Sequence, residues 1–319
     1  MVSPKRSVYY WRTTFKLDDT ETKFLKKHNI QRMYVRLFDV INEEEGAMPN
    51  RTITFKEDVP EGIEIVPVVF FDVDIFNEQQ NALSAKFVKR VADIMSSHNI
   101  EWNELQVDFD WTERNQDKYF AFLEEVRNQL KGREKGLSTT IRLHQLAMKA
   151  PPVDYGALMV YNIGNYSDQK EKNSVLSVEN LRPYMRYLNK YSLPLTTALP
   201  IYSWNLAFHG DEFMAIAHNV DLNDTTLYKY IGKEGKDEYL VMRYHIADNS
   251  AVTELDGLHL YPGDMIRHED CSAELLKEVR SMISNERKNA TEQVILYHLD
   301  NKNINKYKNE DIEDIFGNR

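Results

Sequence analysis

The chain has 319 residues, a length at which a closed α/β barrel commonly forms one domain. Its residues are 42% hydrophobic and its formal net charge is -10, which indicates a globular protein and argues against nucleic acid or an anionic membrane as partner. The sequence contains no run of eighteen apolar residues that would predict a membrane span. Its single cysteine, Cys271, cannot form an internal disulfide.

Short segments rich in β-branched and aromatic residues recur along the chain between turn or charged residues, which is typical of strands. The predicted strands cover residues 7–15, 32–40, 64–71, 104–111, 137–143, 157–162, 195–202 and 293–300. Between several of them apolar residues return every three or four positions, as Leu83, Phe87 and Val91 do, which predicts amphipathic helices. This alternation favours a (β/α)8 TIM barrel over residues 1–319.

An open, doubly wound sheet is the alternative fold. Its dinucleotide-binding version has little support, because no glycine-rich fingerprint follows the first predicted strand.

The segment from about Asn205 to Asp264 interrupts the alternation of strands and helices. It follows the seventh predicted strand and contains a strand-like piece, Tyr239 to Ile246, with turn signals at Asp256-Gly257 and Pro262-Gly263. Because the loop that leaves a barrel strand lies on the catalytic face, we expect this inserted subregion to wall or cover the barrel mouth.

Acidic side chains gather at the end of the fourth predicted strand. The period of two along a strand places Asp108 and Asp110 on one side, above Gln106, and Glu113 follows just beyond. Two neighbouring carboxylates raise each other's proton affinity, which suits one of them to act as an acid near neutral pH.

A structural interpretation stands beside this catalytic one. The acids could cap the following helix or form ion pairs with Arg12, Arg36 and Arg142 on neighbouring strands. Capping accounts for Thr112 or Asp110, but it does not account for a second aspartate that faces inward.

Two short motifs resemble those of chitinase-like family-18 glycoside hydrolases. Residues 108–113, Asp-Phe-Asp-Trp-Thr-Glu, are similar to the Asp-x-Asp-x-Glu signature of that family, and residues 159–162, Met-Val-Tyr-Asn, to its Met-x-Tyr-Asp motif. The resemblance implies that Glu113 is the proton donor, that Asp110 is its partner, and that Tyr161 with Asn162 orients an acetamido group of the substrate. Here one extra residue precedes the glutamate, and asparagine replaces the second acid.

As a whole the chain resembles uncharacterised barrel proteins of Bacteroidales type. The landmarks are Tyr10-Trp11-Arg12, Arg142-Leu143-His144-Gln145 and Tyr297-His298-Leu299-Asp300. This resemblance implies the fold and a cell-envelope protein, such as a lipoprotein facing the periplasm whose export signal has been removed. Without such a signal a cytoplasmic location is expected.

Other polar and aromatic residues fall at predicted strand ends, where they could ring a pocket for a polyhydroxylated ligand. They include Trp11, Arg12, Arg142, His144, Trp204, His298 and Asp300. Glu269 is the best second carboxylate, and with Glu113 it could form an acid and nucleophile pair if the two groups lie roughly 5 Å apart.

We expect neither a metal nor another cofactor. Metal-dependent barrel hydrolases usually carry His-x-His on the first strand, whereas this strand contains Val8-Tyr9-Tyr10-Trp11-Arg12.

The leading hypothesis is a glycoside-hydrolase-like protein that binds an oligosaccharide or amino-sugar polymer at the barrel mouth and could hydrolyse it with Glu113 or Asp110 as the acid. The alternative is a non-catalytic carbohydrate-binding barrel that has lost the activity. A third hypothesis, an interaction protein that docks through its long insertion, depends on the length of that insertion alone.

Overall fold

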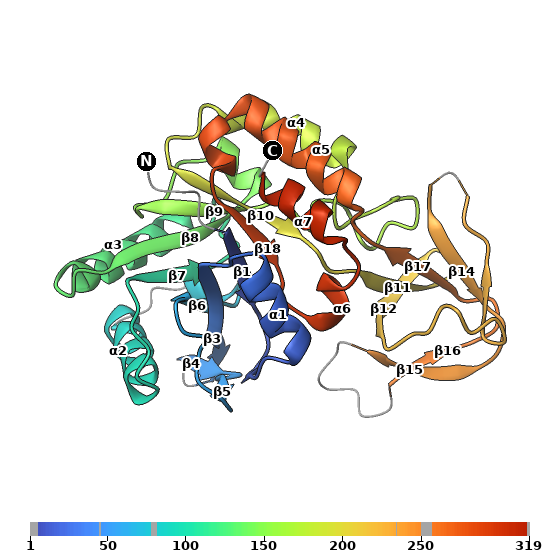
Figure 1. The fold of residues 1–319 in the computed structure, drawn as a ribbon, viewed down its shortest axis with the longest axis horizontal. Coiled ribbons are helices and arrows are strands. Elements are labelled where there is room, and N and C mark those ends of the chain that lie inside the picture. The colour runs from blue at the N-terminus through green and yellow to red at the C-terminus, as the bar shows by residue number, and fades with distance from the viewer. Residues whose placement is uncertain (1–5, 45, 78–81, 234, 250–256, 318–319) are drawn as a thin grey trace.

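Eight parallel strands form a closed barrel in the computed structural model, which describes residues 6–44, 46–77, 82–233, 235–249 and 257–317 (Figure 1). The barrel strands, in their order around the barrel, are β1 (Arg6–Tyr10), β3 (Arg32–Glu43), β6 (Glu64–Phe71), β7 (Glu104–Asp108), β8 (Gly136–Arg142), β9 (Tyr155–Met159), β10 (Leu195–Pro200) and β18 (Val294–Tyr297). The barrel closes because β1 pairs in parallel with both β3 and β18. The predicted (β/α)8 fold is confirmed.

Each predicted strand overlaps one barrel strand, and the differences lie at strand ends. The first prediction covers two strands, because after β1 the chain leaves the barrel and forms the short β2 (Thr14–Phe15), which pairs with β5 (Thr54–Phe55). The fourth prediction runs past the end of β7. There the polar and apolar alternation continues through Asp110 and Trp111, although the backbone pairing ends at Asp108.

Helices cover the outside of the barrel. They are α1 (Asp19–Lys27), α2 (Leu83–Ser97), α3 (Gln116–Lys131), α4 (Val178–Leu188), α5 (Ala273–Glu286), α6 (Asn301–Ile304) and α7 (Asn309–Phe316), with the 3-10 turns η1 (Ile75–Asn77), η2 (Leu143–Ala147) and η3 (Lys288–Thr291). In the described part of the chain, two barrel connections contain no α-helix. A hairpin with β4 (Gly46–Asn50) follows β3, and η2 alone joins β8 to β9.

Sequence accounts for where these helices begin and which face they bury. The Asp18 side chain accepts a hydrogen bond from the Glu21 amide at the start of α1, and the Glu21 carboxylate accepts one from the Asp18 amide in return. Along α3, Tyr119, Leu123 and Val126 are fully buried against the barrel, as their spacing predicts.

A separate cluster of side chains fills the barrel interior. Tyr9 and Tyr34 project inward from β1 and β3, and the small Ala157 and Ala198 project from β9 and β10. The Tyr9 hydroxyl donates a hydrogen bond to Gln106 Oε1 over 2.6 Å, so the polar Gln106 is satisfied within the barrel. The interior is therefore packed, and space for a ligand must lie above or beside it.

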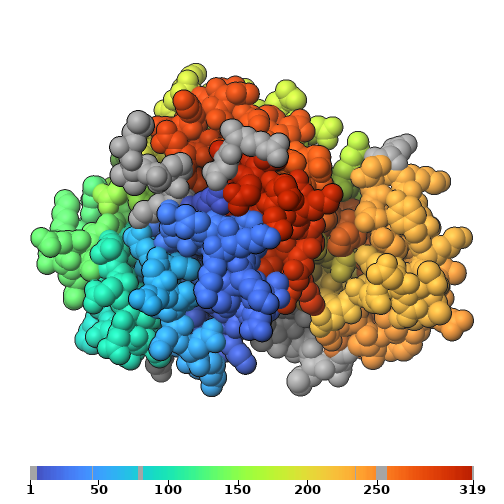
Figure 2. Space-filling model, viewed as in Figure 1, coloured from blue at the N-terminus to red at the C-terminus, as the bar shows by residue number. Residues whose placement is uncertain are grey.

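The insertion after β10 is a seven-stranded antiparallel sheet that stands beside the barrel as a lobe, coloured from yellow to orange (Figures 1 and 2). Its strands are β11 (Trp204–His209), β12 (Glu212–His218), β13 (Tyr228–Tyr230), β14 (Asp237–Val241), β15 (His245–Asn249), β16 (Leu258–Leu260) and β17 (Met265–Glu269). The single strand predicted over residues 239–246 is divided between β14 and β15. Pro262-Gly263 forms the expected turn, with Gly263 at a φ of 99°, and Asp256 lies outside the described residues.

An ion pair joins α7, the last helix, to the amino end of β1. Arg6 on β1 donates two hydrogen bonds to the Glu313 carboxylate on α7, over 2.6 and 3.0 Å, and His28 Nδ1 lies 2.7 Å from Glu313 Oε1. The hydrogen bonds from Arg6 and, more weakly, from His28 lower the pKa of Glu313 from 4.5 to about 2.

This ion pair predicts how acid affects the stability of the chain. Because the folded-state pKa of Glu313 lies below its unfolded value of 4.5, the contribution of the ionised carboxylate is fully present above pH 4.5 and is lost as pH falls toward about 2. We expect Glu313→Gln to be less stable than the parent above pH 4.5 and the difference to shrink below it, as measured by urea unfolding at a series of pH values. A difference that stays constant across the series would contradict this coupling.

Candidate functional site

A buried ion pair lies at the carboxyl ends of β7 and β8. Asp108 is 4% exposed, and its Oδ1 accepts hydrogen bonds from Arg142 Nη2 over 3.0 Å and from Thr140 Oγ1 over 2.6 Å. Burial by itself would lower the pKa of Arg142, but nearby carboxylates, Asp108 above all, raise it above its ordinary value. Arg142 Nη1 has no hydrogen-bond partner among the described residues, which leaves one donor at the barrel mouth.

Asp110 is the exposed member of the aspartate pair. Its side chain is 45% exposed, and its Oδ1 lies 3.3 Å from Gln145 Nε2 and 3.5 Å from His144 Nε2. Gln145 also binds the Trp111 carbonyl and the Arg142 amide, so η2 holds the loop after β7 in place. Because Arg142 neutralises Asp108, the two aspartates are not an isolated pair of carboxylates.

Glu113 lies in the turn between β7 and α3, where its side chain is exposed. The turn is closed by Asn115, whose Oδ1 accepts a hydrogen bond from the Thr112 amide over 2.8 Å. Because β7 ends at Asp108, Glu113 lies beyond the strand. No hydrogen bond or ion pair of Glu113 occurs in the described part of the chain, so its carboxylate is open to solvent and ligand.

Tyr161 and Asn162 follow β9 and meet the aromatic residues of neighbouring strands. The Tyr161 ring stacks on Tyr297 with 4.6 Å between centroids, and its hydroxyl donates to Met159 Sδ over 2.9 Å. Burial raises the pKa of Tyr161 well above its ordinary value. Asn162 Oδ1 accepts a hydrogen bond from the Tyr202 hydroxyl. The pair therefore lies at the mouth, and the Tyr161 hydroxyl is engaged with the protein.

Glu269 ends β17 and is buried, with 1% of its surface exposed. Its Oε1 accepts a hydrogen bond from Arg267 Nε over 2.8 Å. Its Oε2 accepts hydrogen bonds from Trp204 Nε1, from the Ser174 amide and hydroxyl, and from the Val175 amide. With both oxygens engaged, Glu269 has a structural role as a link between the inserted sheet and the loop before α4. These contacts give Glu269 no free oxygen for the expected acid and nucleophile pair with Glu113.

The remaining residues expected at the mouth have identifiable partners. Trp11 packs edge-on against Tyr297 at 5.7 Å, and Arg12 donates two hydrogen bonds to Glu21, over 2.8 and 2.9 Å. Asp300 caps α6 by accepting a hydrogen bond from the Lys302 amide. Arg12 and Asp300 thus have local structural roles as well as a place on the rim.

A cavity of about 760 Å³ opens between the barrel rim and the inserted sheet. From the barrel side it is lined by Tyr202, His298, Asp300 and Lys302, and from the sheet by Trp204, Asn205, residues 216–223, Asp237, Tyr239 and His268. Trp204, His298 and Asp300 belong to the residues expected from the sequence. Tyr202 and Asp237 do not, and no local sequence signal singles them out.

Two imidazoles of this cavity are neutral at pH 7. Burial lowers the pKa of both His268 and His298 below the ordinary value of 6.5. His268 Nδ1 lies 2.7 Å from Asn205 Oδ1 and donates to it, which leaves Nε2 as an acceptor. The cavity therefore combines aromatic faces, carboxylates and neutral imidazoles.

Two further properties concern only the described residues. Among them no three side chains of the metal-binding types His, Cys, Asp and Glu converge as an ion site would require. In the same residues no helix has the length and apolar character to cross a membrane.

Comparison with solved structures shows what kind of barrel this is. The chain is similar to the Ostrinia furnacalis Group IV chitinase, with a TM-score of 0.59 and 10% identity over 98% of this chain and 100% of that one. It is also similar to the Bacillus megaterium spore cortex-lytic enzyme SleL, with a TM-score of 0.55 and 10% identity over 92% of this chain and 70% of the enzyme. The chain therefore shares the barrel fold of these two enzymes.

A third similar structure contains a ligand. It is a mutant of catalytic domain 2 of the Ostrinia furnacalis Group II chitinase in complex with penta-N-acetylchitooctaose, with a TM-score of 0.52 and 11% identity over 93% of this chain and 90% of that one. No protein-family model and no curated protein sequence matches the chain. At these identities the similarity establishes the barrel fold alone, and the roles of individual residues rest on the geometry of this chain.

The contrast between buried and exposed carboxylates can be tested by stability. Glu269→Gln removes the counter-charge of Arg267, which is fully buried, and should lower the free energy of unfolding by about 3–5 kcal/mol. The matched control is Glu124→Gln on the exposed face of α3, which should change it by less than about 0.5 kcal/mol. Urea unfolding of both variants measures the difference in the free energy of unfolding. A Glu269→Gln variant as stable as the control would contradict the structural role of Glu269.

Proposed function

We propose that this chain binds an oligosaccharide or amino-sugar polymer in the cavity between the barrel rim and the inserted sheet. The observation that carries the proposal is the composition of that cavity, in which Tyr202 and Trp204 present aromatic rings beside Asp237, Asp300 and two neutral imidazoles. Ligand pockets typically combine apolar and aromatic walls with a few polar groups that fix orientation.

The aromatic part of the cavity suits the flat, apolar faces of sugar rings. The rings of Tyr202 and Trp204 lie 5.9 Å apart at an interplanar angle of 80°, so they form two adjoining walls. Both side chains are partly exposed. Tyrosine and tryptophan supply contact area together with a polar handle, which is what a ligand of mixed polarity requires.

The polar part of the cavity suits hydroxyl and amide groups. The carboxylates of Asp237 and Asp300 are hydrogen-bond acceptors, and the free Nε2 of His268 is another. Among the described residues that line the cavity, Lys302 is the only Lys or Arg. This charge balance favours a neutral or amine-bearing ligand over an anionic polymer.

The fold comparison supports the choice of an amino-sugar polymer as ligand class. The Group II chitinase domain, which matches most of this chain in fold, was crystallised with penta-N-acetylchitooctaose. Transfer of this ligand class to the present chain is part of the proposal.

Binding predicts a specific response to substitution of Tyr202. Tyr202→Ala should weaken binding of N-acetylglucosamine oligomers about tenfold, because a large aromatic contact is lost. Tyr202→Phe keeps the ring and should bind like the parent. Isothermal titration calorimetry measures both, with Tyr261→Ala as the control, since Tyr261 is an exposed tyrosine outside the cavity. Equal affinity in Tyr202→Ala and Tyr261→Ala would refute a role for the cavity.

A second candidate function is hydrolysis of the bound polymer. The observation that favours it is that Asp110 and Glu113, unlike Asp108, lie at the exposed end of β7 and form no described ion pair with an arginine. Either carboxyl group could then protonate a glycosidic oxygen as a general acid.

Hydrolysis is tested by release of reducing ends from N-acetylglucosamine oligomers. If the parent hydrolyses them, Glu113→Gln or Asp110→Asn should lower the rate about 100-fold, because general acid catalysis typically contributes at least that much. Glu124→Gln is the control for a lost carboxylate. A parent chain that binds these oligomers without releasing reducing ends would instead be a non-catalytic carbohydrate-binding barrel.

A further inference from the structure

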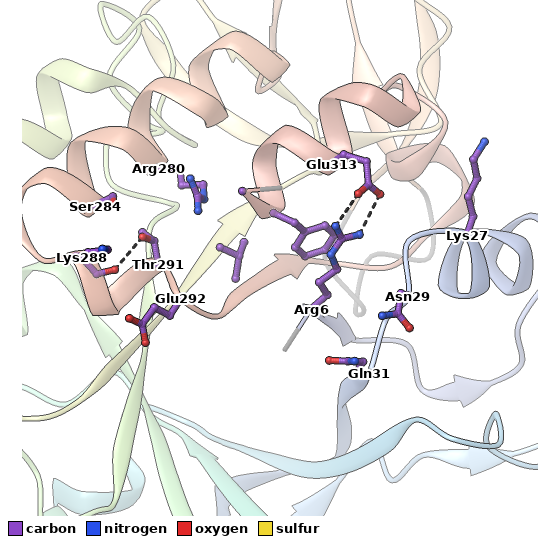
Figure 3. Close-up of a pocket in the computed structure, with 13 residues that line it drawn as sticks. Arg6, Lys27, Asn29, Gln31, Arg280, Ser284, Lys288, Thr291, Glu292 and Glu313 are labelled. Atoms are coloured by element: carbon purple, nitrogen blue, oxygen red, sulfur yellow. Dashed lines mark hydrogen bonds and ion pairs between the residues drawn. The ribbon is translucent and has the colours of Figure 1, made fainter. Parts of the chain in front are cut away.

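A second cavity, of about 710 Å³, opens at the end of the barrel opposite the mouth (Figure 3). Arg6 and Val294 are the first residues of β1 and β18, and Gln31 immediately precedes β3, so these lining residues mark the amino ends of the strands. The other lining residues come from helices and loops and include Lys27, Arg280, Ser284, Lys288, Glu292 and Glu313.

Cationic side chains predominate in this cavity, although the whole chain has a formal net charge of -10. Four of the described lining residues are lysine or arginine, and two are glutamate. Arg6 and Glu313 form the ion pair that Figure 3 shows with dashed lines, so they balance each other. Lys27, Arg280 and Lys288 then face Glu292 alone among the described charges that line the cavity.

Arg280 differs from Arg287, which lies seven residues later. Burial lowers the pKa of both guanidinium groups. Arg287 is satisfied by the carbonyls of Leu188, Tyr191 and Leu193, at 2.7 to 3.2 Å. Arg280 forms no hydrogen bond or ion pair within the described residues, and its Nε is buried without a partner. A buried donor without a partner is costly, so this guanidinium is suited to bind an anion from outside.

The chain leaves room for the Arg280 guanidinium at the end of α7. Gly317 has a φ of 90°, and a Cβ atom there would lie 1.9 Å from Arg280 Nη2, so the glycine makes room for the side chain. Ser284 lies four residues after Arg280 on α5 and therefore shares its helix face. Lys288 approaches the same cavity from η3, as Figure 3 shows.

We propose that this cavity binds a phosphate group, held by the guanidinium of Arg280 and the ammonium group of Lys288, with the Ser284 hydroxyl as a further donor. The donors are the planar guanidinium of Arg280 and the hydroxyl of Ser284 on α5, and the ammonium group of Lys288 on η3. A tetrahedral anion can accept hydrogen bonds from all three groups, because it presents oxygens in several directions. A planar carboxylate is already satisfied by the two parallel hydrogen bonds of a guanidinium. The phosphate can be inorganic phosphate or the phosphoryl group of a phosphorylated sugar.

The test is isothermal titration calorimetry of the full chain with inorganic phosphate, glucose 6-phosphate and glucose at constant ionic strength. Arg280→Gln and Lys288→Gln should each weaken phosphate binding about tenfold, because each removes a charge-assisted hydrogen bond. Lys86→Gln, which removes an exposed lysine of α2 outside the cavity, should bind like the parent. Lys288 is also exposed, so its variant tests the site even if Arg280→Gln is unstable.

Each result decides a definite point. Binding of both phosphate compounds, but not of glucose, through Arg280 and Lys288 supports the site, and the tighter of the two compounds identifies the source of the phosphate group. Absence of phosphate binding by the parent, or binding that survives Lys288→Gln or a folded Arg280→Gln undiminished, overturns the proposal. Oligosaccharide binding at the mouth is measured separately, so failure here leaves the proposed function unaffected.

Discussion

The structure depends on a constraint that applies to any charge inside a closed barrel, which is that the charge must have a partner. Asp108 faces the packed interior and is paired with Arg142 and Thr140. Glu269 is equally buried in the inserted region and is paired with Arg267. These pairings divide the four acids expected at the mouth into two that hold the structure together and two, Asp110 and Glu113, that stay exposed.

Packing of the mouth also decides where a ligand can lie. Tyr161 stacks on Tyr297 above the ion pair, and Trp11 packs against the same ring, so aromatic side chains occupy the region directly over the barrel axis. The larger space lies beside the axis, where the inserted sheet meets the rim. An insertion that looks like an elaborate loop in the sequence is therefore one wall of the proposed site.

The sequence predicted the eight barrel strands because each combines a short apolar run with clear turn or charge signals. The inserted sheet was harder to predict, since strands such as β13 and β16 have only three residues, and since β11 and β14 both pair with β17, which lies far from β11 in the chain. For the acids that follow the fourth predicted strand the sequence left two interpretations open, catalysis or ion pairing, because Arg142 lies 34 residues later and only folding brings it to Asp108. The cavity residues Tyr202 and Asp237 carry no local pattern, because they become neighbours only through that same long-range pairing.

The contacts of Glu269 have a consequence for how quickly a ligand could exchange. One carboxylate joins β17 to the backbone of Ser174 and Val175 and to the ring of Trp204, which is itself part of the cavity wall. This buried carboxylate therefore holds the cavity wall against the loop before α4. If the cavity binds an oligosaccharide as proposed, the exchange rate would then depend on the number of sugar units that contact this wall.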